Sequence, residues 1–302
     1  KDHLHSNMLI VLESTTYPGS TRELILPYIS ENKNLIPGKN IHLCFSPERI
    51  DPGNKTYNTS NTPKVIGGIT KKCSEFGKSL YSKMISEIIL VNSTETAEMV
   101  KLLENTFRAI NIGLANEVAI MCEKLGVNAW EVIDAASTKP FGFMKFKPGP
   151  GLGGHCIPID PYYLSYIASK NKFKMKVALA GRTVNNNMKN FVLQKFYNYI
   201  KSKKIKKNSS ILLVGLTYKY GVADLRNSLN LEIFKQIKKT FKKTRYFDPF
   251  INEKENFNKL ENLKNYKTII FLSYGEKFLN LFKKLKKKKV NIIDPFKYYE
   301  KF

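Results

Sequence analysis

The sequence predicts an α/β protein in which two sheet-forming regions are separated by a helical middle region. Three observations predict this class. Short apolar runs of strand length alternate with helical patterns over residues 1–92, and the same alternation returns over residues 208–302. Between them, residues 93–207 carry two long amphipathic patterns with the helical period.

The first region contains four predicted strands and begins its first helix at Thr21. The strands are expected at residues 9–14, 41–45, 64–68 and 88–91, with another helix before the last. Mostly parallel sheets of this kind bind ligands at the carboxyl ends of their strands. Thr15 and Glu48 stand just past two such ends, so each is either a ligand-binding residue or part of an ordinary turn.

The middle region is predicted to hold one helix from Ser93 to Gly126 and another over about residues 174–203. The first repeats apolar residues at steps of three and four, at Val100, Leu103, Phe107, Ile110, Leu114, Val118, Met121 and Leu125. Lys101 and Asn105 lie one turn apart on a different face, which periodicity alone interprets as a solvated polar face. Two long helices of this kind suggest a domain that also dimerises.

The segment Pro148–Leu164, between these helices, is rich in glycine and proline and is predicted to be neither helix nor strand. It holds Cys156, which is either a nucleophile in a functional loop or a buried structural cysteine. Gly149, Gly151 and Gly154 fit the pattern G-x-G-x-x-G, but we expect no strand before it and no helix after it. We therefore reject it as a phosphate-binding loop.

The last region is predicted to form strands at residues 211–215, 243–247, 268–273 and 290–294. Lys219 and Arg226 follow the first of these strands, where cationic side chains suit a diphosphate. The alternative is an ion pair between Asp224 and Arg226.

Composition limits the functions available to this chain of 302 residues. Its formal charge of +25 comes mostly from lysine and is accompanied by no nucleic-acid-binding motif, so we expect no nucleic-acid partner. A basic field suits an anionic small substrate such as a nucleoside diphosphate. The four cysteines show no metal-binding spacing, and no apolar run is long enough to span a membrane. We therefore expect no metal, no membrane contact and a cytoplasmic location.

Five stretches together resemble the UDP-glucose/GDP-mannose dehydrogenase family of nucleotide-sugar 6-dehydrogenases. They are ESTTYPG (13–19), FSPERIDPG (45–53), the Lys101–Asn105 helix, GGHCIPID (153–160) and GLTYKYGVADLRNS (215–228), in the family's order. The resemblance implies a partial Rossmann-like NAD-binding domain over 1–92, a helical dimerisation domain with a catalytic cysteine over 93–207, and a Rossmann-like UDP-sugar-binding domain over 208–302.

Residues 138–164 look most like the branch of the family that oxidises UDP-N-acetylglucosamine. The UDP-glucose branch usually has Lys where this chain has Ile159, and the UDP-N-acetylmannosamine branch usually lacks the PFGF run at 140–143. The resemblance therefore implies NAD-dependent, four-electron oxidation of a UDP-sugar for surface polysaccharide, with UDP-glucose and UDP-N-acetylmannosamine as alternative substrates.

The family's site residues carry over position by position. Cys156 is the implied nucleophile, Lys101 and Asn105 stabilise oxyanions, and Asp160 and Glu48 act as base and water-positioning groups with Thr15. Thr15 and Glu48 are also implied to lie near NAD. The residues implied to bind the UDP-sugar are Phe146, Lys147, Gly153, Lys219 and Arg226.

The chain also departs from the family pattern. The family's N-terminal G-x-G-x-x-G and its ribose-binding acidic residue have no counterpart here, so we expect the chain to lack its true N-terminus. Asn227 replaces an acidic residue often found before Ser228. A second hypothesis is therefore a truncated, non-catalytic fragment that dimerises and binds UDP-sugar.

Overall fold

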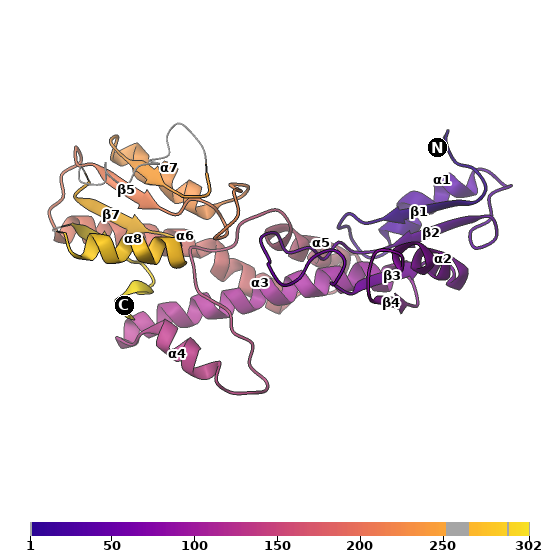
Figure 1. The fold of residues 1–302 in the computed structure, drawn as a ribbon, viewed down its shortest axis with the longest axis horizontal. Coiled ribbons are helices and arrows are strands. Elements are labelled where there is room, and N and C mark those ends of the chain that lie inside the picture. Colours follow the sequence, from indigo (N-terminus) through magenta and orange to yellow (C-terminus); the bar gives the residue numbers. More distant parts are fainter. Residues whose placement is uncertain (1, 252–265, 289, 302) are drawn as a thin grey trace. The chain divides into compact units, whose positions relative to one another are not determined.

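The computed structural model describes residues 2–251, 266–288 and 290–301 (Figure 1). The chain divides into two compact units, Lys1–Phe107 with Ile159–Lys176, and Arg108–Pro158 with Val177–Phe302. The helices α3 (Thr94–Leu125) and α5 (Cys156–Lys170) contribute residues to both.

The first unit contains a four-stranded sheet in the order β1-β2-β3-β4. Its strands are β1 (Met8–Leu12), β2 (Ile41–Phe45), β3 (Lys64–Gly68) and β4 (Ile88–Val91). The pairs β1–β2 and β3–β4 are parallel, while β2–β3 is antiparallel. The sequence therefore located all four strands to within two residues and correctly predicted an α/β class.

Helices complete this first unit. A π-helical turn, η1 (Thr21–Ile25), runs directly into α1 (Leu26–Ser30), where one helix from Thr21 was expected. The helix α2 (Lys71–Tyr81) starts at Thr70, whose hydroxyl accepts a hydrogen bond from the Cys73 amide. It packs on the sheet, and Gly77 leaves room for the Cys44 sulfur, which would lie 3.1 Å from a Cβ at that position.

The second unit contains a parallel sheet in the order β6-β5-β7-β8. These strands are β5 (Ile211–Val214), β6 (Arg245–Phe247), β7 (Thr268–Phe271) and β8 (Asn291–Ile293). Alternate residues of β5 face opposite ways, since Ile211 and Leu213 join the core formed with α6 (Lys176–Ser202) and α7 (Leu229–Thr240). Leu212 and Val214 join the core formed with α8 (Glu276–Lys286). A short 3₁₀ turn, η3 (Tyr299–Lys301), follows β8.

Two glycines let α3 and α6 approach closely in the second unit. A Cβ on Gly113 would lie 2.8 Å from the Gly181 carbonyl oxygen, and a Cβ on Gly181 would lie 3.0 Å from the Ile110 Cα. The short helix α4 (Ala129–Ala136) follows α3 and buries Trp130, whose indole N–H donates to the Phe296 carbonyl at 2.9 Å.

The apolar stripe of α3 is largely exposed at Leu103, Phe107, Leu114, Met121 and Leu125, while the buried positions of the helix are mostly small or polar. One sequence expectation about the helices is wrong. The glycine- and proline-rich segment was expected to contain no helix, yet α5 begins at Cys156 and accommodates Pro161. Pro158 falls in the first turn of α5, where the missing amide hydrogen is not needed.

No helix among the residues described is both long enough and apolar enough to cross a membrane.

Candidate active site

A buried carboxylate fixes the turn that follows β1. Glu98 of α3 is fully buried and accepts hydrogen bonds from the backbone amides of Gly19, at 2.6 Å, and Thr21, at 2.9 Å. The hydroxyls of Ser20 and Thr21 also donate to it. Half-buried Thr15 lies earlier in the same segment, between β1 and these anchored residues.

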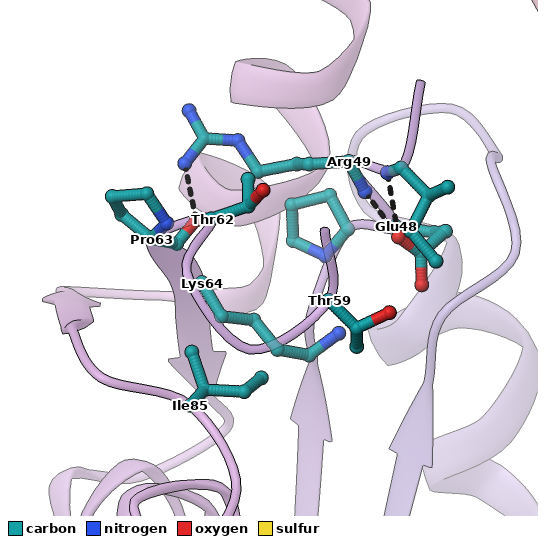
Figure 2. A pocket seen from close by; sticks show the side chains of 9 residues that line it. Glu48, Arg49, Thr59, Thr62, Pro63, Lys64 and Ile85 are labelled. Atoms are coloured by element: carbon teal, nitrogen blue, oxygen red, sulfur yellow. Dashed lines mark hydrogen bonds between the residues drawn. The ribbon is translucent and has the colours of Figure 1, made fainter. Parts of the chain in front are cut away.

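The loop after β2 folds its own acidic residue back onto the backbone. The Glu48 carboxylate accepts hydrogen bonds from the amides of Arg49 and Ile50, both at 2.7 Å (Figure 2). The Arg49 guanidinium donates to the Pro63 carbonyl at 2.7 Å and pairs with Glu104 of α3. The loop is therefore held on two sides.

A pocket with about 250 Å³ of empty, partly open space lies beside this loop. Figure 2 shows Glu48 and Arg49 at one side of it and Lys64 across from them. The Lys64 amine is 2.8 Å from the Glu13 carboxylate, to which the Tyr81 hydroxyl also donates. Burial alone would raise the pKa of Glu13, but these two donors outweigh it and lower the pKa.

Four predicted site residues of the first unit contact one another in pairs. The Lys101 amine donates a hydrogen bond to the Glu48 carbonyl oxygen, and the Asn105 amide donates to the Asp160 carboxylate. Asn105 and Asp160 are both buried. Because Glu98, Lys101 and Asn105 are spaced i, i+3, i+7, one face of α3 holds the turn, the loop and the carboxylate of α5.

The predicted nucleophile is the first residue of α5. Cys156 is exposed, whereas Cys44, Cys73 and Cys122 are buried. Asp160 follows one turn later on the same helix. Residues 141–155 contain no helix or strand, so Gly149–Gly154 does not lie between a strand and a helix. No strand precedes this motif, as expected, but the expectation that no helix follows it was wrong, because α5 begins at Cys156.

The backbone before Cys156 is clamped in the second unit. Tyr218 packs so closely on Gly153 that a Cβ there would lie 2.5 Å from the Tyr218 Cβ. The Gly154 amide donates to the Arg226 carbonyl at 2.9 Å, and the Asn227 side-chain amide donates to the Gly154 carbonyl at 3.0 Å.

A buried pair of asparagines holds the same segment at its other end. The Asn116 side chain accepts a hydrogen bond from the Gly149 amide at 2.8 Å and donates to the Asn185 side chain at 2.9 Å. Asn185 in turn donates to the Ala109 carbonyl at 2.8 Å. A backbone N–H at one end and a carbonyl at the other fix the direction of this chain of hydrogen bonds.

The predicted substrate-binding residues all fall in the second unit. The amine of exposed Lys147 lies 5.7 Å from the centre of the Tyr274 ring, and the neighbouring Phe146 is half-buried. Half-buried Lys219 lies in the loop that follows β5. Arg226 is 2.7 Å from Asp224, as the alternative interpretation expected. This partner raises the pKa of Arg226 and lowers that of Asp224, mainly through their hydrogen bonds.

The predicted residues thus form two groups. Thr15, Glu48, Lys101, Asn105 and Asp160 belong to the first unit, and Cys156 with the predicted sugar- and UDP-binding residues belongs to the second. Sequence reasoning missed Glu98, Arg49, Glu104, Asn116 and Asn185. The spacing of Glu98 from Lys101 was the signal available for the first of these.

The position of Thr15 and Glu48 is compatible with binding a cofactor such as NAD. Thr15 and Glu48 follow the carboxyl ends of the parallel strands β1 and β2, where open α/β sheets bind their ligands. The diphosphate of a dinucleotide normally lies on a glycine-rich turn between a strand and a helix. The one G-x-G-x-x-G of this chain is the segment before Cys156.

Comparison with protein families identifies all three regions. Residues 1–85 match the NAD binding domain of the UDP-glucose/GDP-mannose dehydrogenase family. Residues 95–187 match its central domain, and residues 212–301 match its UDP binding domain.

Two curated relatives and one solved structure illustrate the similarity. A UDP-N-acetyl-D-glucosamine 6-dehydrogenase of Salmonella typhi is 35% identical over 83% of this chain and 59% of its own length. A UDP-N-acetyl-D-mannosamine dehydrogenase of Methanocaldococcus jannaschii is 39% identical over 76% of this chain and 50% of its own. The structure of a UDP-D-ManNAc dehydrogenase from Pyrococcus horikoshii is 32% identical, with a TM-score of 0.86 over 97% of this chain and 69% of that one. The chain thus spans 59% and 50% of the two curated relatives' lengths.

Proposed function

The chain belongs to the UDP-glucose/GDP-mannose dehydrogenase family, and we propose that it takes part in the NAD-dependent oxidation of a UDP-N-acetylhexosamine at C6 to the uronic acid. The observation that carries the proposal is the helix α5. It presents an exposed thiol at its first residue, and one turn later the Asp160 carboxylate bonds to Asn105. We infer that the product serves surface polysaccharide.

The chemistry explains why a thiol is needed. Thr15 and Glu48 would lie near NAD, which when bound would supply the hydride acceptor. Once the alcohol has become an aldehyde, no second hydride leaves readily, so the Cys156 thiolate adds to the aldehyde carbon and forms a C–S bond. Transfer of a second hydride from this thiohemiacetal, to a second molecule of NAD that replaces the first NADH, would give a thioester. Water then adds to the thioester, the C–S bond breaks, and the carboxylate and the free thiolate are released.

The remaining polar residues handle protons and developing charge. Each tetrahedral species carries an oxyanion, for which Lys101 and Asn105 supply N–H donors. Asp160 and Glu48 serve as the base and the water-positioning group, with Thr15 helping to hold the water. In the second unit we assign sugar binding to Phe146, Lys147 and Gly153, and diphosphate binding to Lys219 and Arg226.

The proposal also specifies the substrate, which depends on the configuration of the sugar at C2. Relatives named for the N-acetylglucosamine substrate and for the N-acetylmannosamine substrate are about equally similar to this chain. The sequence around the PFGF run favours UDP-N-acetylglucosamine, which we propose as the substrate, with UDP-N-acetylmannosamine as the competing candidate and UDP-glucose as the more distant one.

The decisive experiment measures NADH formed per sugar consumed with each of the three UDP-sugars. We expect two NADH per molecule of UDP-N-acetylglucosamine, because the alcohol loses two hydrides in all. Cys156→Ser is expected to lose acid formation by at least about a thousandfold while still binding substrate, since removal of a nucleophile has effects of that order. Normal acid production by Cys156→Ser would disprove the covalent route.

A non-catalytic role is the competing interpretation of this chain. In that role the chain would bind UDP-sugar without oxidising it. Binding of UDP-sugar, detected as a thermal shift, without any NADH would support that role.

We also propose that two copies of the chain associate through the central helices. The exposed stripe Leu103, Phe107, Leu114, Met121 and Leu125 supports this, because so many large apolar side chains along one helix are typical of an interface. A cytoplasmic location completes the proposal, since the exposed Cys156 thiol must stay reduced.

A further inference from the structure

Asn227 has an unusual backbone conformation beside the thiol segment. Its φ is +50°, in the left-handed region that asparagine tolerates better than most residues. The next residue, Ser228, caps α7 and donates its hydroxyl hydrogen to the Leu216 carbonyl at 2.6 Å. Asn227 is therefore attached to a fixed point of the C-terminal sheet region while its own side chain remains available for another contact.

That contact is with Gly154. The Asn227 side-chain amide donates to the Gly154 carbonyl at 3.0 Å, and the Gly154 amide donates to the Arg226 carbonyl at 2.9 Å. Both polar backbone groups of Gly154 are thus held by two adjacent residues.

The backbone conformation of Gly154 and the closeness of Tyr218 leave no room for a side chain at this position. Its φ is +85°, and a Cβ there would lie 2.9 Å from a ring carbon of Tyr218. A Cβ on Gly153 would lie 3.2 Å from the Asn227 carbonyl oxygen. Since α5 begins two residues after Gly154, the clamp at Gly154 lies directly before the start of the helix and its first residue, Cys156.

We propose that Asn227 is a positioning residue for the Cys156 thiol and acts through the Gly154 carbonyl; the functional meaning of this role rests on the proposed nucleophilic role of Cys156. A carbonyl oxygen only accepts hydrogen bonds, so the side chain that meets it must carry a donor, which the Asn227 amide supplies. An aspartate would place a second oxygen against it.

The clamp also links two proposed sites. Arg226, assigned to the diphosphate, supplies the carbonyl that holds the Gly154 amide, and Asn227 holds the Gly154 carbonyl. A diphosphate bound at Arg226 thereby stabilises the segment that carries the nucleophile.

The test compares Asn227→Gly with the wild type in the 302-residue chain. Glycine adopts the left-handed conformation without strain and introduces no charge, so the variant removes only the side-chain hydrogen bond. The matched control is Asn7→Gly, because Asn7 is also exposed and has a φ of +64° in the other unit. Two readouts are used, deuterium uptake by the peptide containing Gly154 and the pH profile of Cys156 alkylation by iodoacetamide.

In Asn227→Gly we expect deuterium uptake around Gly154 to be about fivefold faster, the factor that corresponds to one lost hydrogen bond. We expect the alkylation profile to move to higher pH, because a loosened helix start favours the thiolate less. Asn7→Gly should leave both readouts unchanged, and the three buried cysteines report on global opening. Wild-type values for both readouts in Asn227→Gly would overturn the proposal.

A second arm adds UDP to the wild type, where we expect slower exchange at Gly154. If UDP has no effect while Asn227→Gly still exchanges faster, the UDP site of the proposed function fails and the positioning role stands.

Discussion

Two glutamates three residues apart on α3 hold the same short segment in different ways. Glu98 is fully buried and accepts hydrogen bonds from backbone amides and hydroxyls around Gly19–Thr21. Glu95 lies near the surface and pairs with Arg22 at 2.6 Å. The buried carboxylate is the stronger constraint, because an unpaired buried acceptor is costly, whereas a surface ion pair contributes at most about 1 kcal/mol.

The surface pair predicts a specific pH dependence. Burial would raise the pKa of Glu95, but the Arg22 hydrogen bond and nearby polar groups lower it to about 2. A carboxyl group whose pKa is lower in the folded state stabilises the fold above the unfolded pKa and loses this effect as pH falls. We therefore expect Glu95→Gln to reduce the loss of stability between about pH 4.5 and pH 2, by at most about 1 kcal/mol.

Thermal unfolding at pH 6 and at pH 3 measures this difference. Glu117→Gln is the control, since Glu117 is an exposed glutamate of the same helix. Equal acid sensitivity in wild type, Glu95→Gln and Glu117→Gln would show that the pair with Arg22 does not lower the Glu95 pKa.

At the scale of elements, the crossing of α3 and α6 supports the thiol segment. The glycine contact brings the helices close, and Asn116 and Asn185 then join them by a hydrogen bond and reach the Gly149 amide. Both asparagines are almost fully buried. This crossing is therefore a rigid support for one end of the segment that Asn227 holds at the other.

Asn116→Ala is expected to destabilise the chain by about 1–3 kcal/mol, because it leaves the Gly149 amide and one polar atom of Asn185 without their partner. Urea unfolding measures the loss. The control is Asn187→Ala, an exposed asparagine of α6, which reports the gain in helix propensity from the same change of residue. Similar free energies of unfolding for both variants would show that the asparagine pair contributes nothing to stability.

The helices and strands also show which parts of the fold can be predicted from patterns in the sequence. Strands such as Ile41–Phe45 were located from apolar runs between turn residues, because complete burial leaves a strong local signal. The start of α5 was missed because proline was taken as a helix breaker, although the first turn tolerates it. The buried face of α3 was missed because glycine, alanine and asparagine pack there, which hydrophobic periodicity does not detect.

In the candidate site, too, some residues could be predicted from the sequence and others could not. Cys156, Lys101, Asn105 and Asp160 were predicted from motifs, and the structure joins Asn105 to Asp160 by a hydrogen bond. Residues such as Asn116 and Asn227 were not recognised, because their hydrogen-bond partners lie 33 and 73 positions away along the chain. No local pattern encodes contacts of that kind.

At the scale of the whole molecule, the exposed stripe of α3 leads to a prediction about association. Burying a leucine or methionine side chain contributes about 1.5–3 kcal/mol, and a two-fold interface includes each side chain twice. Replacing Leu114 and Met121 together by lysine should therefore weaken the proposed dimer by more than about a hundredfold.

Light scattering after size-exclusion chromatography measures the mass of each variant, and circular dichroism checks that the helices remain. Leu24→Lys is the control, because Leu24 is a similarly exposed leucine of the first unit that lies outside the stripe. We expect the double variant to be monomeric at concentrations where the wild type and Leu24→Lys are dimeric. A dimer that persists with Leu114 and Met121 replaced would place the interface elsewhere, and the apolar stripe would then require a different partner.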